Sequence, residues 1–205
     1  MEPPVKSRRD EHADATRDAL LDVGRRFFVE PGYAQSSAEG IVRAARLTRG
    51  ALYHHFGGKQ GLFRAVFEAL EQEAATEINA TLVEHTGDPW RQLLAGIDTF
   101  LRVCTHRDYR RIVLQEGPVA LGPRLWREID ERYLLAALRD ALERLVDAGI
   151  IERRPIDLLT RSMYAFLTEL AECIADADDE HAARADAADL ARGVFTGLTV
   201  RESPL

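Results

Sequence analysis

The sequence contains very little cysteine. Its 205 residues include two, Cys104 and Cys173, and each lies inside an apolar helical pattern. A disulfide between them is possible, but reduced thiols in a cytoplasmic protein are the favoured interpretation. No apolar run is long enough to cross a membrane, and the N-terminus has no apolar signal core. We therefore expect a cytoplasmic protein that does not associate with a membrane.

The motifs of common enzyme classes are also missing. There is no glycine-rich phosphate loop, no nucleophile elbow and no zinc-spaced Cys/His cluster. The adjacent His54 and His55 diverge by about 100° on a helix, so they cannot chelate one ion together. A metal sensor that uses Cys104 and His106 is conceivable but poorly supported. We expect no enzymatic activity, no cofactor and no metal.

Alternating strand patterns are absent, whereas apolar spacings near 3.6 residues recur along the chain. The spacings, together with caps and Gly/Pro breaks, predict an all-α protein. Two short helices are expected between residues 37 and 56. Longer helices are expected over residues 12–30, 59–85, 89–104, 108–115, 123–147, 157–176 and 179–200. We expect a small N-terminal domain over residues 1–58 and a larger helical domain over residues 59–205.

Acidic residues are missing from Gly40 to Phe67, although acids outnumber bases in the whole chain and the net charge is −7. The same interval carries arginines, a lysine and both adjacent histidines. The first sixty residues hold more bases than acids, and the rest of the chain is strongly acidic. An acid-free patch of this kind is typical of a surface that contacts phosphate.

The pattern from Ser37 to Phe56 predicts a helix-turn-helix. Ser37 is a suitable N-cap, and Ile41, Ala44 and Ala45 follow on one apolar face. Arg46 and Leu47 make the turn, and Thr48 is positioned to cap the second helix.

Within that second helix, Leu52 and Phe56 are four residues apart and form the core pair. Gly50 and His54 then point away from the core, with Arg49 and Tyr53 nearby. Such a face suits insertion into the major groove of DNA.

The segment TRGALYHHF, from Thr48 to Phe56, is followed by Gly58-Lys59 and Leu62-Phe63. It resembles the recognition-helix signature of the TetR family of bacterial transcriptional regulators. The first helix and its Pro31-Gly32-Tyr33 ending are also similar to the family, and the resemblance covers residues 10 to 70. One departure is Arg46, at a turn position that the family often fills with glycine. A positive φ there costs about 1 kcal/mol, and Arg46 could add a phosphate contact.

The resemblance implies specific DNA contacts. Four residues correspond to phosphate contacts: Ser37, Thr48, Tyr53 and Lys59. Four correspond to residues that face base edges: Arg49, Gly50, Ala51 and His54. His55 is as well suited to packing as to a phosphate contact. The arm over residues 1–10 carries Lys6, Arg8 and Arg9, and it is either a frayed terminus or a segment that follows the DNA.

The larger domain is rich in bulky side chains among apolar positions. Ordinary core packing is the simpler interpretation of each one. The resemblance implies a pocket for a small effector, with Glu169 as its most suggestive polar residue. The candidate pocket residues are Trp90, Phe100, Cys104, Glu116, Trp126, Tyr133, Tyr164, Phe166 and Glu169.

The last two long helices are amphipathic, and their apolar residues either complete the core or form a dimer interface. A single helix-turn-helix covers too little DNA for tight specific binding, so two-fold pairing is expected. The resemblance points to the same helices. The candidate interface residues are Leu158, Leu167, Ala171, Leu190, Val194, Phe195 and Leu198.

Together these features predict a transcriptional repressor. Its dimer would bind a palindromic double-stranded DNA operator and be released by a small-molecule effector. The alternative is a helical ligand-binding protein, or an activator, for which DNA binding is not the main activity.

Overall fold

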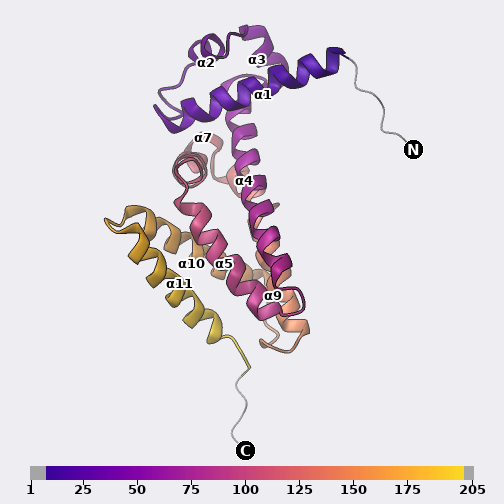
Figure 1. Cartoon of the computed structure of the whole chain (residues 1–205), viewed down its shortest axis with the longest axis vertical. Helices are drawn as coiled ribbons and strands as arrows, with labels where there is room; N and C mark the ends of the chain where they lie inside the picture. Colours follow the sequence, from indigo (N-terminus) through magenta and orange to yellow (C-terminus); the bar gives the residue numbers. More distant parts are fainter. Residues whose placement is uncertain (1–7, 201–205) are drawn as a thin grey trace, which may run out of the picture.

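A computed structural model describes the backbone of residues 8–200 and the side chains of residues 12–200 (Figure 1). This part of the chain is helical throughout and has no strand beyond one isolated bridge between Ile151 and Thr199. The helices are α1 (Arg8–Val29), α2 (Ala38–Ala44), α3 (Arg49–Phe56), α4 (Lys59–Glu84), α5 (Pro89–Thr105), α6 (Arg107–Tyr109), the π-helix η1 (Arg110–Glu116), α7 (Gly117–Leu121), α8 (Pro123–Asp130), α9 (Leu134–Asp147), α10 (Ile156–Asp176) and α11 (Glu180–Thr196). The predicted all-α class is therefore confirmed.

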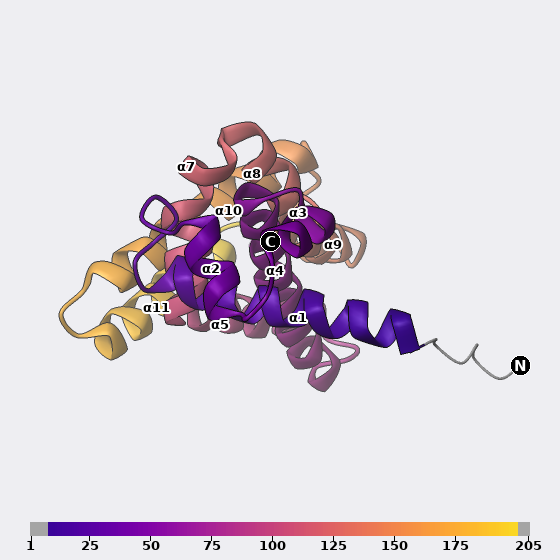
Figure 2. The ribbon, with the colours of Figure 1, turned by 90° about the horizontal axis from the view of Figure 1, so that it is seen from above.

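Helices α1, α2 and α3 form a small unit around the N-terminal end of α4 (Figures 1 and 2). Its centre is an aromatic cluster in which the Phe63 ring lies 5.0 Å from that of Phe28 and 4.9 Å from that of Tyr33. Helix α1 begins earlier than expected, and Gly32 takes a positive φ of 88° just after its end. Most of the predicted N-terminal arm lies outside the described residues.

Helix α4 belongs to both halves of the molecule. Leu62 and Phe63 in its first turns are fully buried in the N-terminal unit, whereas Ile78 is buried near its other end. In Figure 1 the helix runs from α1 down the side of α5, and its 26 residues make it the longest element of the described chain. One continuous helix therefore contributes buried residues to the cores of both units.

The rest of the chain packs as a helical layer around α5. Figure 1 shows α11 on the side of α5 away from α4, with α10 packed against both α5 and α11. Their inner residues fill the core, whereas Leu158 and Leu190 are 67% and 53% exposed. No helix in the described part of the chain is both long enough and apolar enough to cross a membrane.

The helix expected over 179–200 ends at Thr196, and two other predicted helices differ more strongly from the structure. The helix expected over 108–115 continues as η1 and α7 to Leu121, and Pro118 falls near the start of α7, directly after the π-helix. The break comes at Gly122, where φ is 79°.

The helix expected over 123–147 is interrupted between α8 and α9. Tyr133 leaves the helical conformation with φ −111° and ψ −85°. Polar contacts hold the residues of this turn: Arg161 pairs with Glu131, and Arg132 pairs with Glu68 of α4.

Candidate nucleic-acid interface and effector site

The two short helices begin at the predicted caps. The Ser37 Oγ accepts a hydrogen bond from the Gly40 N–H at 3.0 Å, and the Thr48 Oγ1 accepts one from the Ala51 N–H at 3.2 Å. Both side chains are exposed. A capping hydroxyl accepts with its oxygen and keeps its proton, so each can still donate to a phosphate.

The turn between the helices is a Schellman motif centred on Arg46. The Leu47 N–H donates to the Val42 carbonyl at 2.8 Å, and the Arg46 N–H donates to the Arg43 carbonyl at 3.1 Å. Arg46 has φ 55°, and it is the one non-glycine residue with positive φ in the described chain. The strained turn expected at Arg46 is therefore present, and its side chain is exposed.

Inside α2 the buried pair is Ile41 and Val42, whereas Ala44 is exposed. The apolar face expected to include Ala44 is therefore wrong by part of a turn. The helix packs against α1 and α3, and Val42, not Ala44, is buried with Ile41 in this packing.

The exposed face of α3 matches the helix phase. Leu52 is fully buried, whereas Gly50 and His54 are exposed and Tyr53 is 49% exposed. Ala51 and His55 are half-buried at the edges of this face, and the His54 and His55 ring centroids lie 5.1 Å apart.

Arg49 has a partner that the sequence reasoning missed. Its Nη1 lies 2.9 Å from the Glu39 Oε1, and its guanidinium lies over the Tyr53 ring at 5.4 Å. Glu39 precedes the acid-free interval by one residue, and α2 brings its carboxylate across to α3. This exposed pair orients Arg49 beside the recognition face and is open to exchange for a DNA phosphate or base.

Lys59 holds the loop between α1 and α2. Its Nζ donates to the Tyr33 and Ser36 carbonyls at 2.8 and 2.9 Å and lies 4.1 Å from the centre of the Tyr33 ring. The ammonium group thus stabilises the loop after α1. The prediction gave Lys59 only a phosphate contact. Lys59 is the first residue of α4, so the free amides of that helix end remain suited to a phosphate.

The centre of the larger unit contains a buried polar cluster. Glu71 of α4 is 0% exposed and its Oε1 accepts from the Tyr109 hydroxyl at 3.0 Å. Asp130 of α8 is 5% exposed and accepts from the Tyr164 hydroxyl. The fully buried Cys104 completes the cluster.

Burial dominates the electrostatics of this cluster. It raises the pKa of Glu71 to about 8, and the nearby Asp130 carboxyl adds to the effect. Burial also raises the pKa of Asp130 to about 6, against the hydrogen bond from Tyr164. At neutral pH the cluster therefore holds a proton that an exposed glutamate would have lost.

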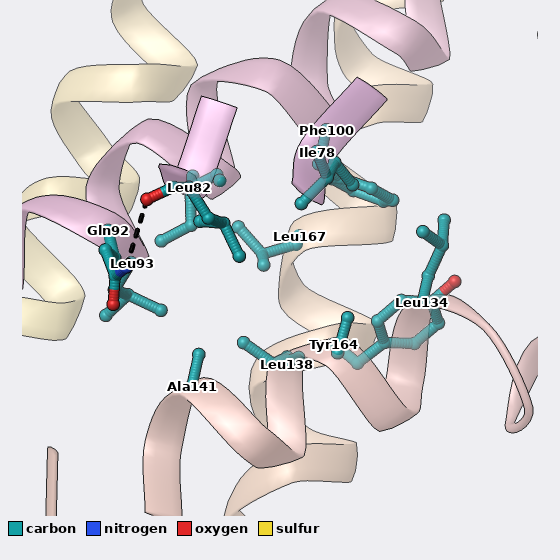
Figure 3. A pocket seen from close by; sticks show the side chains of 13 residues that line it. Ile78, Leu82, Gln92, Leu93, Phe100, Leu134, Leu138, Ala141, Tyr164 and Leu167 are labelled. Carbon is teal, nitrogen blue, oxygen red and sulfur yellow. Dashed lines mark hydrogen bonds between the residues drawn. The ribbon is translucent and has the colours of Figure 1, made fainter. Parts of the chain in front are cut away.

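An apolar cavity lies between α4, α5, α9 and α10, next to this cluster (Figure 3). Its volume of about 50 Å³ is well below that of a typical ligand pocket. It is lined by Ile78, Leu82, Gln92, Leu93, Gly96, Ile97, Phe100, Leu134, Ala137, Leu138, Ala141, Tyr164 and Leu167. A molecule larger than a few waters enters only if these helices separate.

The predicted pocket residues do not gather around one hollow. Phe100 and Tyr164 line the apolar cavity, and Trp126, Tyr164 and Glu169 line a more open depression beside Asp130. Cys104 lies in the polar cluster. Trp90, Tyr133 and Phe166 are half-buried and line neither hollow.

Glu116 is not a pocket residue. Its carboxylate pairs with Arg111 at 2.9 Å and lies against Gly32, in the loop after α1. The prediction was wrong because η1 turns this side chain toward the N-terminal unit.

Three of the predicted dimer residues are buried inside the protomer: Leu167, Ala171 and Phe195. They complete the core between α10, α11 and α5, so they are unavailable to a partner, which corrects the prediction. Leu158 and Leu190 are exposed, and Val194 and Leu198 are half-buried. A narrower apolar stripe than expected remains on this face.

Side-chain contacts tie the N-terminal unit to the larger one. Arg25 of α1 reaches Asp108 of α6 at 2.6 Å and Glu73 of α4 at 3.0 Å. The Gln60 Nε2 of α4 donates to the Ala120 carbonyl of α7 at 3.1 Å. Asp108 precedes Tyr109, so the element that contacts α1 also carries a member of the polar cluster.

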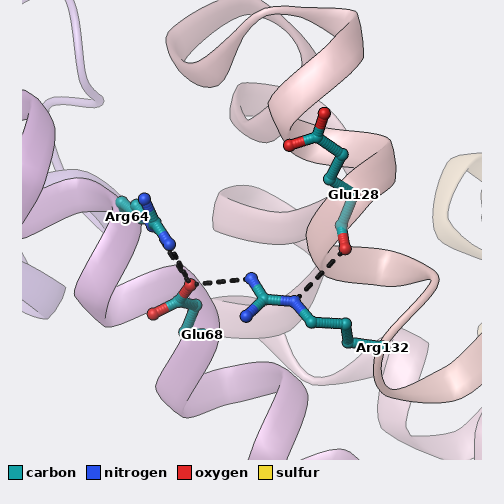
Figure 4. Close-up of polar contacts among 4 residues, drawn as sticks. All are labelled: Arg64, Glu68, Glu128 and Arg132. Atoms are coloured by element: carbon teal, nitrogen blue, oxygen red, sulfur yellow. Dashed lines mark hydrogen bonds and ion pairs between the residues drawn. The ribbon is translucent and has the colours of Figure 1, made fainter.

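A second set of contacts fixes α4 against the turn between α8 and α9 (Figure 4). The Glu68 Oε1 accepts from Arg64 and from Arg132, each at 3.1 Å, and the Arg132 Nε donates to the Glu128 carbonyl at 3.3 Å. These contacts lie next to the polar cluster, because Glu68 is one turn before Glu71 on α4.

A capped helix-turn-helix on an all-helical body defines a class of DNA-binding regulator. Residues 20–66 match the model described as "Bacterial regulatory proteins, tetR family", and residues 90–198 match "Tetracyclin repressor-like, C-terminal domain". The chain therefore belongs to the TetR family of bacterial transcriptional regulators.

Individual proteins agree with this assignment. The chain is 30% identical over 172 residues to the HTH-type transcriptional repressor Rv1474c of Mycobacterium tuberculosis, covering 83% of this chain and 88% of the relative. A TetR-family regulator from Pectobacterium atrosepticum superposes with a TM-score of 0.76 and 29% identity, over 96% of this chain and 99% of that one. RolR, solved with resorcinol, shares the fold with a TM-score of 0.66 and 19% identity, over 95% of this chain and 100% of that one.

Proposed function

We propose that this protein is a repressor that binds a palindromic operator as a homodimer and leaves it when a small effector occupies the larger unit. The observation that carries the proposal is the exposed face of α3, where Gly50, Tyr53 and His54 point outward beside Arg49. Both helix caps and the Schellman turn present this face rigidly, as direct readout in the major groove requires. We assign residues 1–58 to DNA binding and residues 59–205 to effector binding and dimerisation.

The proposed release mechanism follows from the small cavity. An effector that separates the surrounding helices displaces α4, whose other end carries the core of the N-terminal unit. The Arg25 contacts to α4 and α6 couple the same movement to α1. Effector and operator then favour different arrangements of the two recognition helices, which lowers operator affinity.

The DNA-binding part is tested with two variants of α3. Arg49→Ala and Tyr53→Ala each remove an exposed contact, so we expect at least tenfold weaker binding to DNA that the wild-type protein selects from a random pool. Fluorescence anisotropy measures the affinity as a function of salt concentration.

Val83→Ala is the matched control, because Val83 is 72% exposed at the far end of α4. The melting temperatures of all three variants should stay close to that of the wild type. Wild-type affinity in both α3 variants would refute the assigned DNA surface.

A further inference from the structure

We propose that Glu71 and Asp130 form the polar end of the effector site and select an amphipathic organic cation, such as a protonated amine with an apolar body. This inference rests on the proposed effector control of the larger unit and adds the chemical class of the effector. It depends on four features: unpaired buried carboxyls, other unsatisfied polar atoms nearby, an adjoining apolar cavity and the absence of a buried counter-charge.

The two carboxyls lack a cationic partner. Glu71 Oε2 is buried and accepts no hydrogen bond, although its Oε1 is bonded to Tyr109. Within residues 12–200, neither Glu71 nor Asp130 forms an ion pair, whereas their neighbours Glu68 and Glu131 do. Burying a carboxyl without a counter-charge costs free energy, so two such groups beside a cavity are better explained by a ligand than by stability.

Two further buried polar atoms without partners lie one turn from the cluster along their helices. Thr160 is fully buried and its Oγ1 is unpaired, one turn before Tyr164 on α10. The Trp126 Nε1 is also unpaired, one turn before Asp130 on α8. Unsatisfied groups thus come from α4, α8 and α10 toward one region, as in a site that a polar ligand completes.

The apolar cavity leads toward the carboxyls. Ile78, which lines it, lies seven residues after Glu71, so both are on one face of α4 about 10 Å apart along the axis. On α5, Phe100 lines the cavity and Cys104 lies one turn further, in the cluster.

Tyr164 joins the two regions. Its ring lines the cavity, and its hydroxyl donates to Asp130. Figure 3 shows Tyr164 at the opposite end of the cavity from Gln92. An apolar body in the cavity would therefore place a head group near Tyr164 and the carboxyls.

The charge of the surroundings selects the sign of the head group. The titratable groups that act on Glu71 and Asp130 at their buried side are Cys104 of α5, Tyr109 of α6 and Tyr164 of α10, all of them neutral or acidic. On the open side of Asp130, Glu131 follows α8 and is paired with Arg161, and Arg127 and Arg161 line the depression there. At the buried end, away from these arginines, an anionic head group would meet like charge, whereas an ammonium group would find two carboxylates and two phenol oxygens.

Proton release gives this site a distinct signature. Because the pKa of Glu71 is raised to about 8, the empty site holds a proton at pH 7. An ammonium ion binds the ionised carboxylate and expels that proton, so its affinity should rise as the pH rises from 6 to 8. A neutral ligand should show no such dependence.

The test compares three probes with the same tail: octylammonium, 1-octanol and octanoate. Isothermal titration calorimetry of the full-length protein at pH 6, 7 and 8 measures their affinities, and buffers of different ionisation enthalpy measure proton release. We expect octylammonium to bind at least tenfold more tightly than either other probe at pH 8, with proton release at pH 7. Glu71→Gln and Asp130→Asn should each weaken octylammonium at least tenfold and leave 1-octanol within twofold.

Three outcomes would overturn the proposal: equal binding of the three probes, no detectable binding of octylammonium at millimolar concentration, or full retention of its preference in both variants. Proton release is measured on the wild-type protein, so it does not depend on whether a variant folds. Circular dichroism measures whether each variant keeps the helical fold.

Operator binding is measured separately. If operator DNA is bound but released by neutral or anionic molecules independently of Glu71, the repressor function stands and the cation proposal fails. If octylammonium binds as expected but no DNA is bound, the cation site stands and the repressor function fails.

Discussion

At the scale of single residues, side chains at the DNA-facing end have internal partners as well as an exposed surface. Lys59 is bonded to two backbone carbonyls of the loop after α1, and Arg49 is paired with Glu39. The sequence predicts that these cations lie near DNA, but their partners come from other elements. A loss of DNA binding on removing Lys59 would therefore combine a lost contact with a displaced loop.

The buried carboxyls predict an unusual dependence of stability on pH. The pKa of Glu71 rises from 4.5 to about 8 on folding, so the native state keeps a proton that the unfolded chain releases. Its stabilising contribution is complete below pH 4.5 and is lost as the pH rises to about 8. Asp130, with a pKa of about 6, adds a similar loss at lower pH.

Glu71→Gln should therefore lose less stability than the wild type between pH 5 and pH 8. The difference should be on the order of a few kcal/mol, at about 1.4 kcal/mol per pKa unit. Urea unfolding at several pH values measures it, and Glu84→Gln, at an exposed carboxyl near the end of α4, is the control. Parallel pH profiles for Glu71→Gln and the wild type would contradict the prediction.

At the scale of elements, the junction between α3 and α4 depends on Gly61. A Cβ at this position would lie 1.7 Å from the Phe56 carbonyl oxygen, which is backbone and cannot rotate away. Gly61→Ala should therefore reduce the free energy of unfolding by about 3 kcal/mol or more and weaken DNA binding.

Gly50→Ala is the matched control for stability. Gly50 is also helical and exposed, and the nearest atom to its added Cβ is the Thr48 Oγ1 at 3.7 Å. The substitution should be neutral or stabilise by up to about 1 kcal/mol. Equal unfolding free energies for the two alanine variants would show that α4 shifts freely against α3.

Local chemistry explains which elements could be predicted from the sequence. The caps at Ser37 and Thr48 were predicted because one side chain satisfies nearby amides, and both accept the expected bond. The break at Tyr133 could not be predicted, because neither glycine nor proline marks it and distant partners hold it.

The candidate effector site was predicted only in part, for a related reason. Phe100, Trp126 and Tyr164 were selected as bulky residues, but Glu71 was missed. Its signal was present: Phe67, Ala74 and Ile78 lie four before, three after and seven after it, so Glu71 interrupts the apolar stripe of α4. The partners that make this interruption significant, Tyr109 and Asp130, come from other helices.

At the scale of the whole molecule, the outer face of α10 and α11 predicts how two protomers meet. Leu158→Lys and Leu190→Lys place a charge on the exposed apolar stripe, so each should shift a dimer toward monomer at micromolar concentration. Light scattering measures the mass, and Val83→Lys, at an equally exposed apolar position far along α4, should leave it unchanged. A dimer that survives both α10–α11 variants would place the interface elsewhere.

The continuity of α4 has a mechanical consequence. Its 26 residues span about 39 Å, so a tilt of about 5° at the cavity end would move the other end by about 3.4 Å. That displacement equals the rise of about one base pair along DNA. If an effector tilts α4 as proposed, the helix would act as a lever, and in a two-fold dimer two such levers would add their movements. A packing change smaller than one side chain would then displace the recognition helices by about one base pair along the operator.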